Sequence, residues 1–154
     1  MQWIQPNELT QWGHAWRRRG EVIGFTNGCF DLLHPGHVHL LREARSLCDQ
    51  LVVAVNADES VRSLKGFSRP IQPDWLRAEL AGGVARADAV VVFNDPTPAA
   101  LLRDLRPDVL VKGSDYAITD LAGAEFAGRI VLVERLPGYS TTNSVAKLRE
   151  ALGT

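Results

Sequence analysis

The sequence predicts an α/β protein built on one open, doubly wound parallel sheet of about five strands. Short apolar runs alternate with longer amphipathic segments along the chain, a pattern typical of parallel strands joined by helices. The run Leu51–Asn56 is apolar up to its last residue, as in a strand covered on both faces. The chain has 154 residues, which suits one domain with one core. We therefore expect residues 1–154 to form a single domain, with residues 1–20 as an N-terminal helical extension.

The first half of the chain predicts a helix followed by a βαβ unit. Leu9, Trp12 and Trp16 recur at helical spacing, and Gly20 follows them as a candidate helix C-cap. The predicted elements are a helix at Pro6–Arg19, a strand at Val22–Thr26, a helix from Pro35 to about Cys48, and a strand at Leu51–Asn56.

The second half begins with a polar segment, Ala57–Pro73, that is rich in turn-forming residues. We expect it to be a long loop, and long loops in compact domains are often functional. The elements predicted beyond it are a helix from about Asp74 to Ala85, a strand at Ala89–Phe93, a short helix ending at Leu105, a strand at Val109–Lys112, a weak helix at about Leu121–Ala127, a strand at Ile130–Glu134, and a helix at Ser144–Leu152.

The composition excludes several classes of function. Lys and Arg number 17 against 18 Asp and Glu, and the formal net charge of -1 gives no overall attraction to nucleic acid. Cys29 and Cys48 have neither a disulfide framework nor a metal-type spacing, so free thiols are expected. The chain has no basic leader followed by an apolar stretch and no run long enough to span a membrane. We expect a cytoplasmic protein with neither a nucleic-acid nor a membrane partner.

The junction after the first long strand, Thr26–His37, predicts an anion site. Gly28 allows close approach of a ligand to the backbone, and Pro35 suits a first helical position, where the missing N–H costs nothing. The first turn of a helix presents unpaired N–H groups to a phosphate. His34 and His37 are three residues apart and so lie near the same helix mouth. Two imidazoles there could stabilise charge on phosphoryl oxygens.

Three further polar segments follow predicted strands, and in a doubly wound sheet ligands bind beyond the carboxyl ends of the strands. These segments are Asn56–Arg69, Lys112–Tyr116 and Arg135–Thr142.

Each of these segments holds candidate ligand groups with a structural alternative. Lys65 and Arg69 suit an anionic substrate, although single cations are more often solvated. Asp31 and Asp115 could hold magnesium or a ribose hydroxyl, or could form turns and caps. Arg135 with Ser140, Thr141 and Thr142 could bind a polyphosphate, and Thr142 or Asn143 could also cap the last helix.

Other chemistries have weaker support. A zinc site needs three or four protein ligands. His39 should point elsewhere on the helix than His34 and His37, so the local sequence does not supply them. Cys29 has no partner in the sequence that would activate it, so a packing role is expected. Neither a Gly-x-Gly-x-x-Gly motif nor a Gly-x-x-x-x-Gly-Lys-Ser/Thr motif occurs, which weighs against dinucleotide oxidoreductases and P-loop ATPases.

Two motifs resemble those of the cytidylyltransferase-like nucleotidyltransferases, whose sheet is Rossmann-like. One is the His-x-Gly-His box after the first strand, within Gly28–His37, and the other is the Ser-Thr motif in Gly138–Thr142. The resemblance extends from about Val22 to Leu148 and is strongest to the heptose 1-phosphate adenylyltransferases, which make ADP-heptose for lipopolysaccharide cores. The stretches that carry this narrower resemblance are Thr26–Asp31, Val55–Ser60, Leu64–Pro70, Arg106–Tyr116 and Ser140–Asn143.

The resemblance implies that ATP and D-glycero-β-D-manno-heptose 1-phosphate form ADP-heptose and pyrophosphate, with magnesium on the ATP phosphates and no metal site made by protein alone. The implied catalytic residues are His34, His37 and Lys65. The implied nucleotide-binding residues are Asn27, Gly28, Phe30, Gly36, Gly113, Asp115, Arg135, Ser140, Thr141 and Thr142. The sugar-phosphate side is assigned to Asp31, Asn56, Asp58, Arg69 and Arg77.

The chain departs from the family in two ways. Family members often carry an acidic or amide residue before the arginine of the helix that follows the long loop, whereas this chain has Leu76 before Arg77. Some members are fused to a sugar kinase domain that is absent here, so separate proteins are expected to supply the heptose phosphate. Relatives also suggest a homodimer.

Two rival functions remain at this point. A glycerol 3-phosphate cytidylyltransferase would keep the chemistry and change both substrates, and the stretches Leu64–Pro70 and Lys112–Tyr116 argue against it. A non-catalytic nucleotide-sensing module would need the phosphate loop, which is the anion site at Thr26–His37, but not both histidines.

Overall fold

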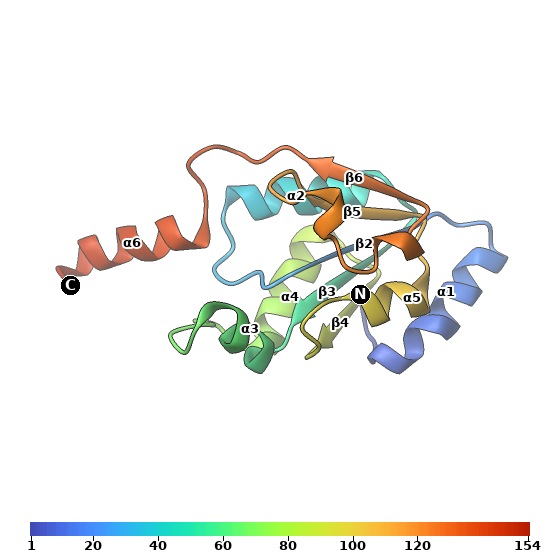
Figure 1. The fold of residues 1–154 in the computed structure, drawn as a ribbon, viewed down its shortest axis with the longest axis horizontal. Helices are drawn as coiled ribbons and strands as arrows, with labels where there is room; N and C mark the ends of the chain where they lie inside the picture. Colours follow the sequence, from blue (N-terminus) through green and yellow to red (C-terminus); the bar gives the residue numbers. More distant parts are fainter.

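The computed structural model describes residues 1–154 and contains one parallel sheet of six strands in the order β1-β4-β3-β2-β5-β6 (Figure 1). The strands are β1 (Gln2–Trp3), β2 (Ile23–Gly28), β3 (Gln50–Asn56), β4 (Ala89–Phe93), β5 (Val109–Gly113) and β6 (Arg129–Val133). The helices are α1 (Leu9–Arg18), α2 (Pro35–Ser46), α3 (Asp58–Lys65), α4 (Asp74–Ala85), α5 (Ala99–Leu105) and α6 (Thr141–Leu152), with 3₁₀ turns η1 (Pro6–Glu8), η2 (Ile118–Asp120) and η3 (Ala124–Phe126). The predicted α/β class with a doubly wound parallel sheet is confirmed.

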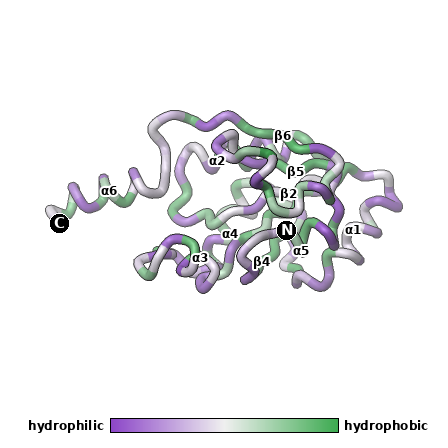
Figure 2. The backbone as a smooth tube through the Cα atoms, viewed as in Figure 1, coloured by the Kyte–Doolittle hydropathy of each residue, from purple (hydrophilic) through white to green (hydrophobic).

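Helices cover both faces of the sheet and give two apolar layers. One layer packs α1 and α5 on the sheet through Leu9, Trp16 and Leu102. The other packs α2 and α4 through Leu41 and Ala81. Figure 2 shows hydrophobic residues following the strands between these layers. Burial on both faces explains why the strands are apolar runs and do not alternate in polarity.

The order of strands reverses beside β2. The chain runs outward from β2 to β3 and β4, and then returns to the other side of β2 with β5. The loops after β2 and β5 therefore leave the sheet in opposite directions, and a crevice forms between them at the carboxyl ends of the strands. Asn27 at the end of β2 and Lys112 on β5 lie at this crevice.

Four predictions of secondary structure need correction. The sheet has a sixth strand, β1, whose two residues are too few to show a period. The predicted loop Ala57–Pro73 contains α3, which buries only Ser60 and Val61 and so lacks a long apolar face. The weak helix predicted at about Leu121–Ala127 is only the short η3. The last helix begins at Thr141, before the predicted Ser144.

Two features concern the outer parts of the chain. The N-terminal residues do more than form a helical extension, because Gln2 N donates to Asp88 O at 2.8 Å and Ile4 N to Val90 O at 3.0 Å. By contrast, α6 extends away from the sheet and buries none of its residues (Figure 1). None of the helices combines the length and the apolar character that crossing a lipid bilayer requires.

Candidate active site

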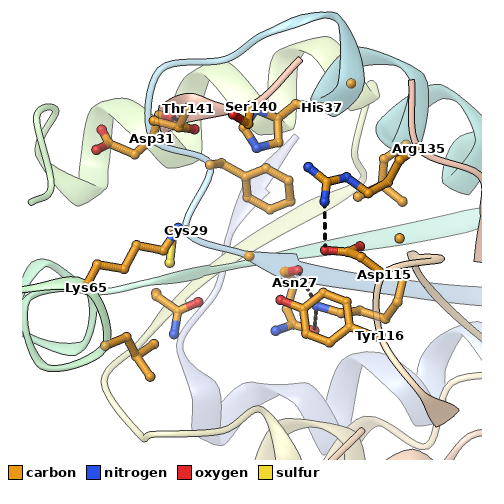
Figure 3. Close-up of a pocket in the computed structure, with 18 of the residues that line it drawn as sticks. Asn27, Cys29, Asp31, His37, Lys65, Asp115, Tyr116, Arg135, Ser140 and Thr141 are labelled. Carbon is orange, nitrogen blue, oxygen red and sulfur yellow. Dashed lines mark hydrogen bonds and ion pairs between the residues drawn. The ribbon is translucent and has the colours of Figure 1, made fainter. Parts of the chain in front are cut away.

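A cavity of about 920 Å³ opens at the carboxyl end of the sheet, between the loops that follow β2 and β5. Segments after four strands contribute to its walls, as the sequence predicts. The predicted site residues in its lining are Asn27, Gly28, Phe30, Asp31, His34, Gly36, His37, Asn56, Lys65, Arg69, Gly113, Asp115, Arg135, Ser140, Thr141 and Thr142. Figure 3 shows His37, Ser140 and Thr141 along one edge, with Asn27 and Tyr116 across from them and Lys65 to one side.

The two histidines form a stacked pair at the start of α2. Their ring centroids are 3.8 Å apart with an interplanar angle of 26°. His34 is the N-cap, and its Nδ1 accepts a hydrogen bond from Gly36 N at 3.1 Å. His34 N in turn lies 3.4 Å from His37 Nδ1 and donates to it. His34 is therefore both the cap of α2 and part of the cavity wall.

These contacts determine which ring nitrogens can face a ligand. Because Nδ1 of each histidine accepts a backbone hydrogen bond, the proton of the neutral ring lies on Nε2. Burial lowers the pKa of His37 to about 4, with His34 and Lys65 acting in the same direction and Asp31 opposing them. Burial and the charge of Arg135 also lower the pKa of His34. Both rings are thus neutral at pH 7 and offer Nε2–H donors to an anion.

Gly36 makes the arrangement of His34 possible. A Cβ on Gly36 would lie 2.9 Å from His34 Cε1 and 3.0 Å from His34 Nδ1. Any other residue would therefore push the capping imidazole out of place. The box therefore needs glycine at position 36, because a side chain there would clash with His34.

Asp31 supports the loop and is not free to bind a ligand. Its side chain is 1% exposed and accepts hydrogen bonds from Ile71 N at 2.9 Å and from Gln72 N at 3.1 Å. Arg69 Nε lies 3.2 Å from Asp31 Oδ2 as an ion pair without a hydrogen bond. Asp31 thereby ties the segment after α3 to the phosphate loop and holds Arg69 at the cavity wall.

Arg77 and Asp58 do not line the cavity, so the prediction that they contact substrate directly needs correction. Arg77 is fully buried and donates to Gln72 O at 2.9 Å, Cys29 O at 2.6 Å and Asp58 Oδ1 at 2.8 Å. The guanidinium therefore clamps the phosphate loop, the segment after α3 and the start of α3 to one another. Its role in this geometry is positional.

The start of α6 is fastened to the phosphate loop. Ser140 is the N-cap, because its Oγ accepts from Asn143 N at 3.0 Å, whereas Thr142 or Asn143 was expected in that place. Thr141 Oγ1 donates to Asp31 O at 2.7 Å. The N–H groups of the first turn of α6 consequently face the same cavity as those of α2.

Lys112 lines this cavity, and the sequence predicts it only as part of the polar segment Lys112–Tyr116, with no role of its own. It is 7% exposed, and its Nζ donates to Asn27 O at 3.0 Å and to Asn27 Oδ1 at 3.4 Å. The ammonium also lies 4.5 Å from the ring centroid of Tyr116. Burial lowers the pKa of Lys112 to about 8, against the opposing charge of Asp115. The sequence does contain a signal for this residue, because Lys112 stands in an otherwise apolar strand. A lysine in such a place is rarely buried without a partner, which indicates a role at the site.

No group of three or more His, Cys, Asp or Glu side chains could hold a metal ion. Asp31 is occupied by the loop, and Asp115 Oδ2 lies 3.5 Å from Arg135 Nη1 at the solvent edge of the cavity (Figure 3).

The sequence profile of the cytidylyltransferase-like family matches residues 25–145, which include both histidines and the start of α6. The chain belongs to this family. Among cytidylyltransferase-like relatives, it is 57% identical over 138 residues to the bifunctional protein HldE of Acidiphilium cryptum, and 53% identical over 137 residues to that of Rhodospirillum rubrum. These matches cover 87% and 86% of this chain but only 28% of each relative, so the chain spans little more than a quarter of their length.

Two solved structures agree with the fold. The lipopolysaccharide core biosynthesis protein from Thermoplasma volcanium superposes with a TM-score of 0.61 at 26% identity, covering 79% of this chain and all 100% of that one. A pantoate-β-alanine ligase from Francisella tularensis has a TM-score of 0.65 at 16% identity, covering 100% of this chain and 80% of that one. The second likeness shows the fold alone.

Proposed function

We propose that the chain is an adenylyltransferase that converts ATP and D-glycero-β-D-manno-heptose 1-phosphate to ADP-heptose and pyrophosphate, for lipopolysaccharide core biosynthesis. The observation that carries the proposal is the pair of imidazoles stacked at the N-terminus of α2, whose Nδ1 atoms accept backbone hydrogen bonds and leave Nε2 of each ring for an anion. The similarity to HldE proteins and to a lipopolysaccharide core biosynthesis protein supports the choice of substrates.

The reaction is a single in-line displacement. An oxygen of the sugar phosphate forms a bond to the α-phosphorus of ATP, the bond from that phosphorus to the bridging oxygen breaks, and pyrophosphate leaves with the electron pair. The nucleophile is already an anion, so no general base is needed. Catalysis then rests on positioning and on stabilising charge at the non-bridging oxygens.

Individual residues have distinct roles in this proposal. His34 and His37 donate Nε2–H to the α-phosphoryl oxygens, and the charge of Lys65 acts beside them, as its effect on the pKa of His37 indicates. The N–H groups at the start of α6 receive the β and γ phosphates. Magnesium held by these phosphates would neutralise charge on the leaving pyrophosphate. Arg69, held by Asp31, meets the sugar phosphate.

The remaining assignments in this proposal concern the ribose and the sugar. Gly113 and Asp115 take the ribose side, and a Cβ on Gly113 would lie 2.6 Å from Asp115 Oδ1, so the glycine allows Asp115 its position. Asn56 donates from Nδ2 to Ser60 Oγ at 3.0 Å, which leaves its carbonyl oxygen for a sugar hydroxyl. We further propose a cytoplasmic enzyme that acts as a homodimer.

The test is pyrophosphate release with ATP or CTP against a panel of heptose, hexose and polyol phosphates. The proposal predicts the highest kcat/KM for ATP with heptose 1-phosphate. Preference for CTP with glycerol 3-phosphate would establish the cytidylyltransferase alternative. Nucleotide binding without turnover for any pair would establish a sensing module.

A further inference from the structure

Lys112 occupies a position that its charge makes costly. The side chain is almost fully buried at the junction of β2 and β5, in the wall of the cavity. Burying an ammonium group destabilises a protein unless the charge is compensated. The groups in direct contact with the ammonium are two oxygens of Asn27 and the face of the Tyr116 ring, and the charge of Asp115 adds to them from farther away. No carboxylate lies within ion-pair distance of Lys112.

The lysine determines which way the Asn27 amide points. An ammonium group only donates hydrogen bonds, so the Asn27 atom that faces it must be Oδ1 and not Nδ2. The amide nitrogen carries both N–H donors and has no hydrogen-bond partner in the protein. Since Asn27 lines the cavity, these donors are available to a ligand there.

The same lysine orders an aromatic ring beside the amide. Tyr116 is 47% exposed and lies over the ammonium group at the cavity wall. Asn27 and Tyr116 lie together in Figure 3, near Asp115 and apart from Lys65. An exposed ring beside a pair of amide donors suits a nucleoside, whose base stacks while its nitrogen or oxygen atoms accept hydrogen bonds.

We propose that Lys112 is a positioning residue that orients the Asn27 amide, so that its N–H groups donate to an acceptor on the nucleoside of ATP. The inference rests on the proposed function, because it takes ATP as the ligand. It adds two residues that determine nucleoside binding. Asn27 contacts the nucleoside, and Lys112 is buried beneath Asn27 and orients it.

The decisive variant is Asn27→Asp. A carboxylate keeps an acceptor for Lys112 and strengthens that contact, but it replaces both N–H donors with an oxygen. We expect the dissociation constants of both ATP and adenosine, measured by titration calorimetry without the second substrate, to rise about tenfold, the effect of losing one buried hydrogen bond. Adenosine is included because repulsion between a new carboxylate and the triphosphate weakens ATP alone.

Two lysine variants test the positioning role. Lys112→Met removes the group that orients the amide and should raise the dissociation constant and the KM for ATP by a similar factor, with a smaller change in kcat. Lys112→Arg keeps donors for Asn27 and should bind ATP more tightly than Lys112→Met. Lys147→Met removes an exposed lysine of α6 that does not line the cavity and should match the wild type.

Several results would overturn the inference. Unchanged adenosine binding in Asn27→Asp, with ATP weakened, would reduce the effect to charge repulsion. Equal binding by Lys112→Met and the wild type would make the lysine a packing residue. Failure of the wild type to bind ATP would remove the proposed function along with the inference, whereas wild-type binding with indifferent variants would remove the inference alone.

Discussion

Replacing Arg77 with methionine should destabilise the protein strongly although the residue touches no part of the cavity. The guanidinium is fully buried and donates to two backbone carbonyls and to the Asp58 carboxylate. Methionine fills a similar volume but donates nothing. The carbonyl of Cys29 and the carbonyl of Gln72 would then stay buried without that partner, while Asp58, whose side chain is 30% exposed, could be rehydrated.

The magnitude follows from these three contacts. Each hydrogen bond to a charged group contributes about 1.5–3 kcal/mol, and removal of one partner from a buried pair costs about 3–5 kcal/mol. Because Asp58 can be rehydrated, we expect Arg77→Met to lower the free energy of unfolding by about 3–4 kcal/mol, in the lower half of that range. For a chain of this size, each kcal/mol lowers Tm by about 2–4 °C. The expected fall in Tm is therefore about 10 °C.

Urea denaturation followed by circular dichroism measures this free energy of unfolding directly. Arg103→Met is the matched control, because Arg103 is exposed on α5 and pairs only with its neighbour Asp104. Solvent screens an exposed pair of this kind, so the Arg103→Met variant should keep nearly the stability of the wild type. A loss below 1 kcal/mol for Arg77→Met, or equal losses in the two variants, would refute the interpretation of Arg77 as a clamp.

The other predictions concern the histidine pair. His37→Ala should lower kcat by about 100-fold, as expected for loss of a donor to the transition state, and KM should change less. Gly36→Ala should also lower kcat, because the new methyl group displaces the His34 ring; Gly83→Ala, a helical glycine with open space around it, is the control and should retain full activity. The free energy of unfolding should rise on the order of 2 kcal/mol between pH 4.5 and 6.5, because the unfolded state binds a proton at His37 that the folded state, with the pKa lowered to about 4, does not. A urea series in which His37→Asn keeps the same pH dependence would contradict that assignment.

The sequence predicts well those features that depend on neighbouring residues. The strand, tight loop and helix start around His34 and His37 come from local signals, namely an apolar run, Gly28 and Pro35. The helix Asp74–Ala85 and the strand Ala89–Phe93 have the predicted bounds. The convergence of four polar segments on one cavity also follows, because parallel strands end at one edge.

Features that depend on contacts between residues far apart in the sequence could not be predicted from local patterns. Asp31 lies within the loop before the motif and Arg77 far beyond it, and only contacts across 40 and 48 residues show that both residues hold loops together. The helix α3 was missed because it buries a single apolar side chain, Val61. The orientation of Asn27 depends on Lys112, which lies 85 residues away in the chain.

Transfer of the α-phosphoryl group is measured most directly with ATP labelled at the α-phosphorus and unlabelled heptose 1-phosphate. The wild type should move the label into a nucleoside diphosphate sugar, with one pyrophosphate released per label transferred and none of the label bound to protein. The His37→Ala variant should do so about 100-fold more slowly. Equal rates in the two proteins, or label trapped on the chain, would contradict in-line transfer at the stacked histidine pair.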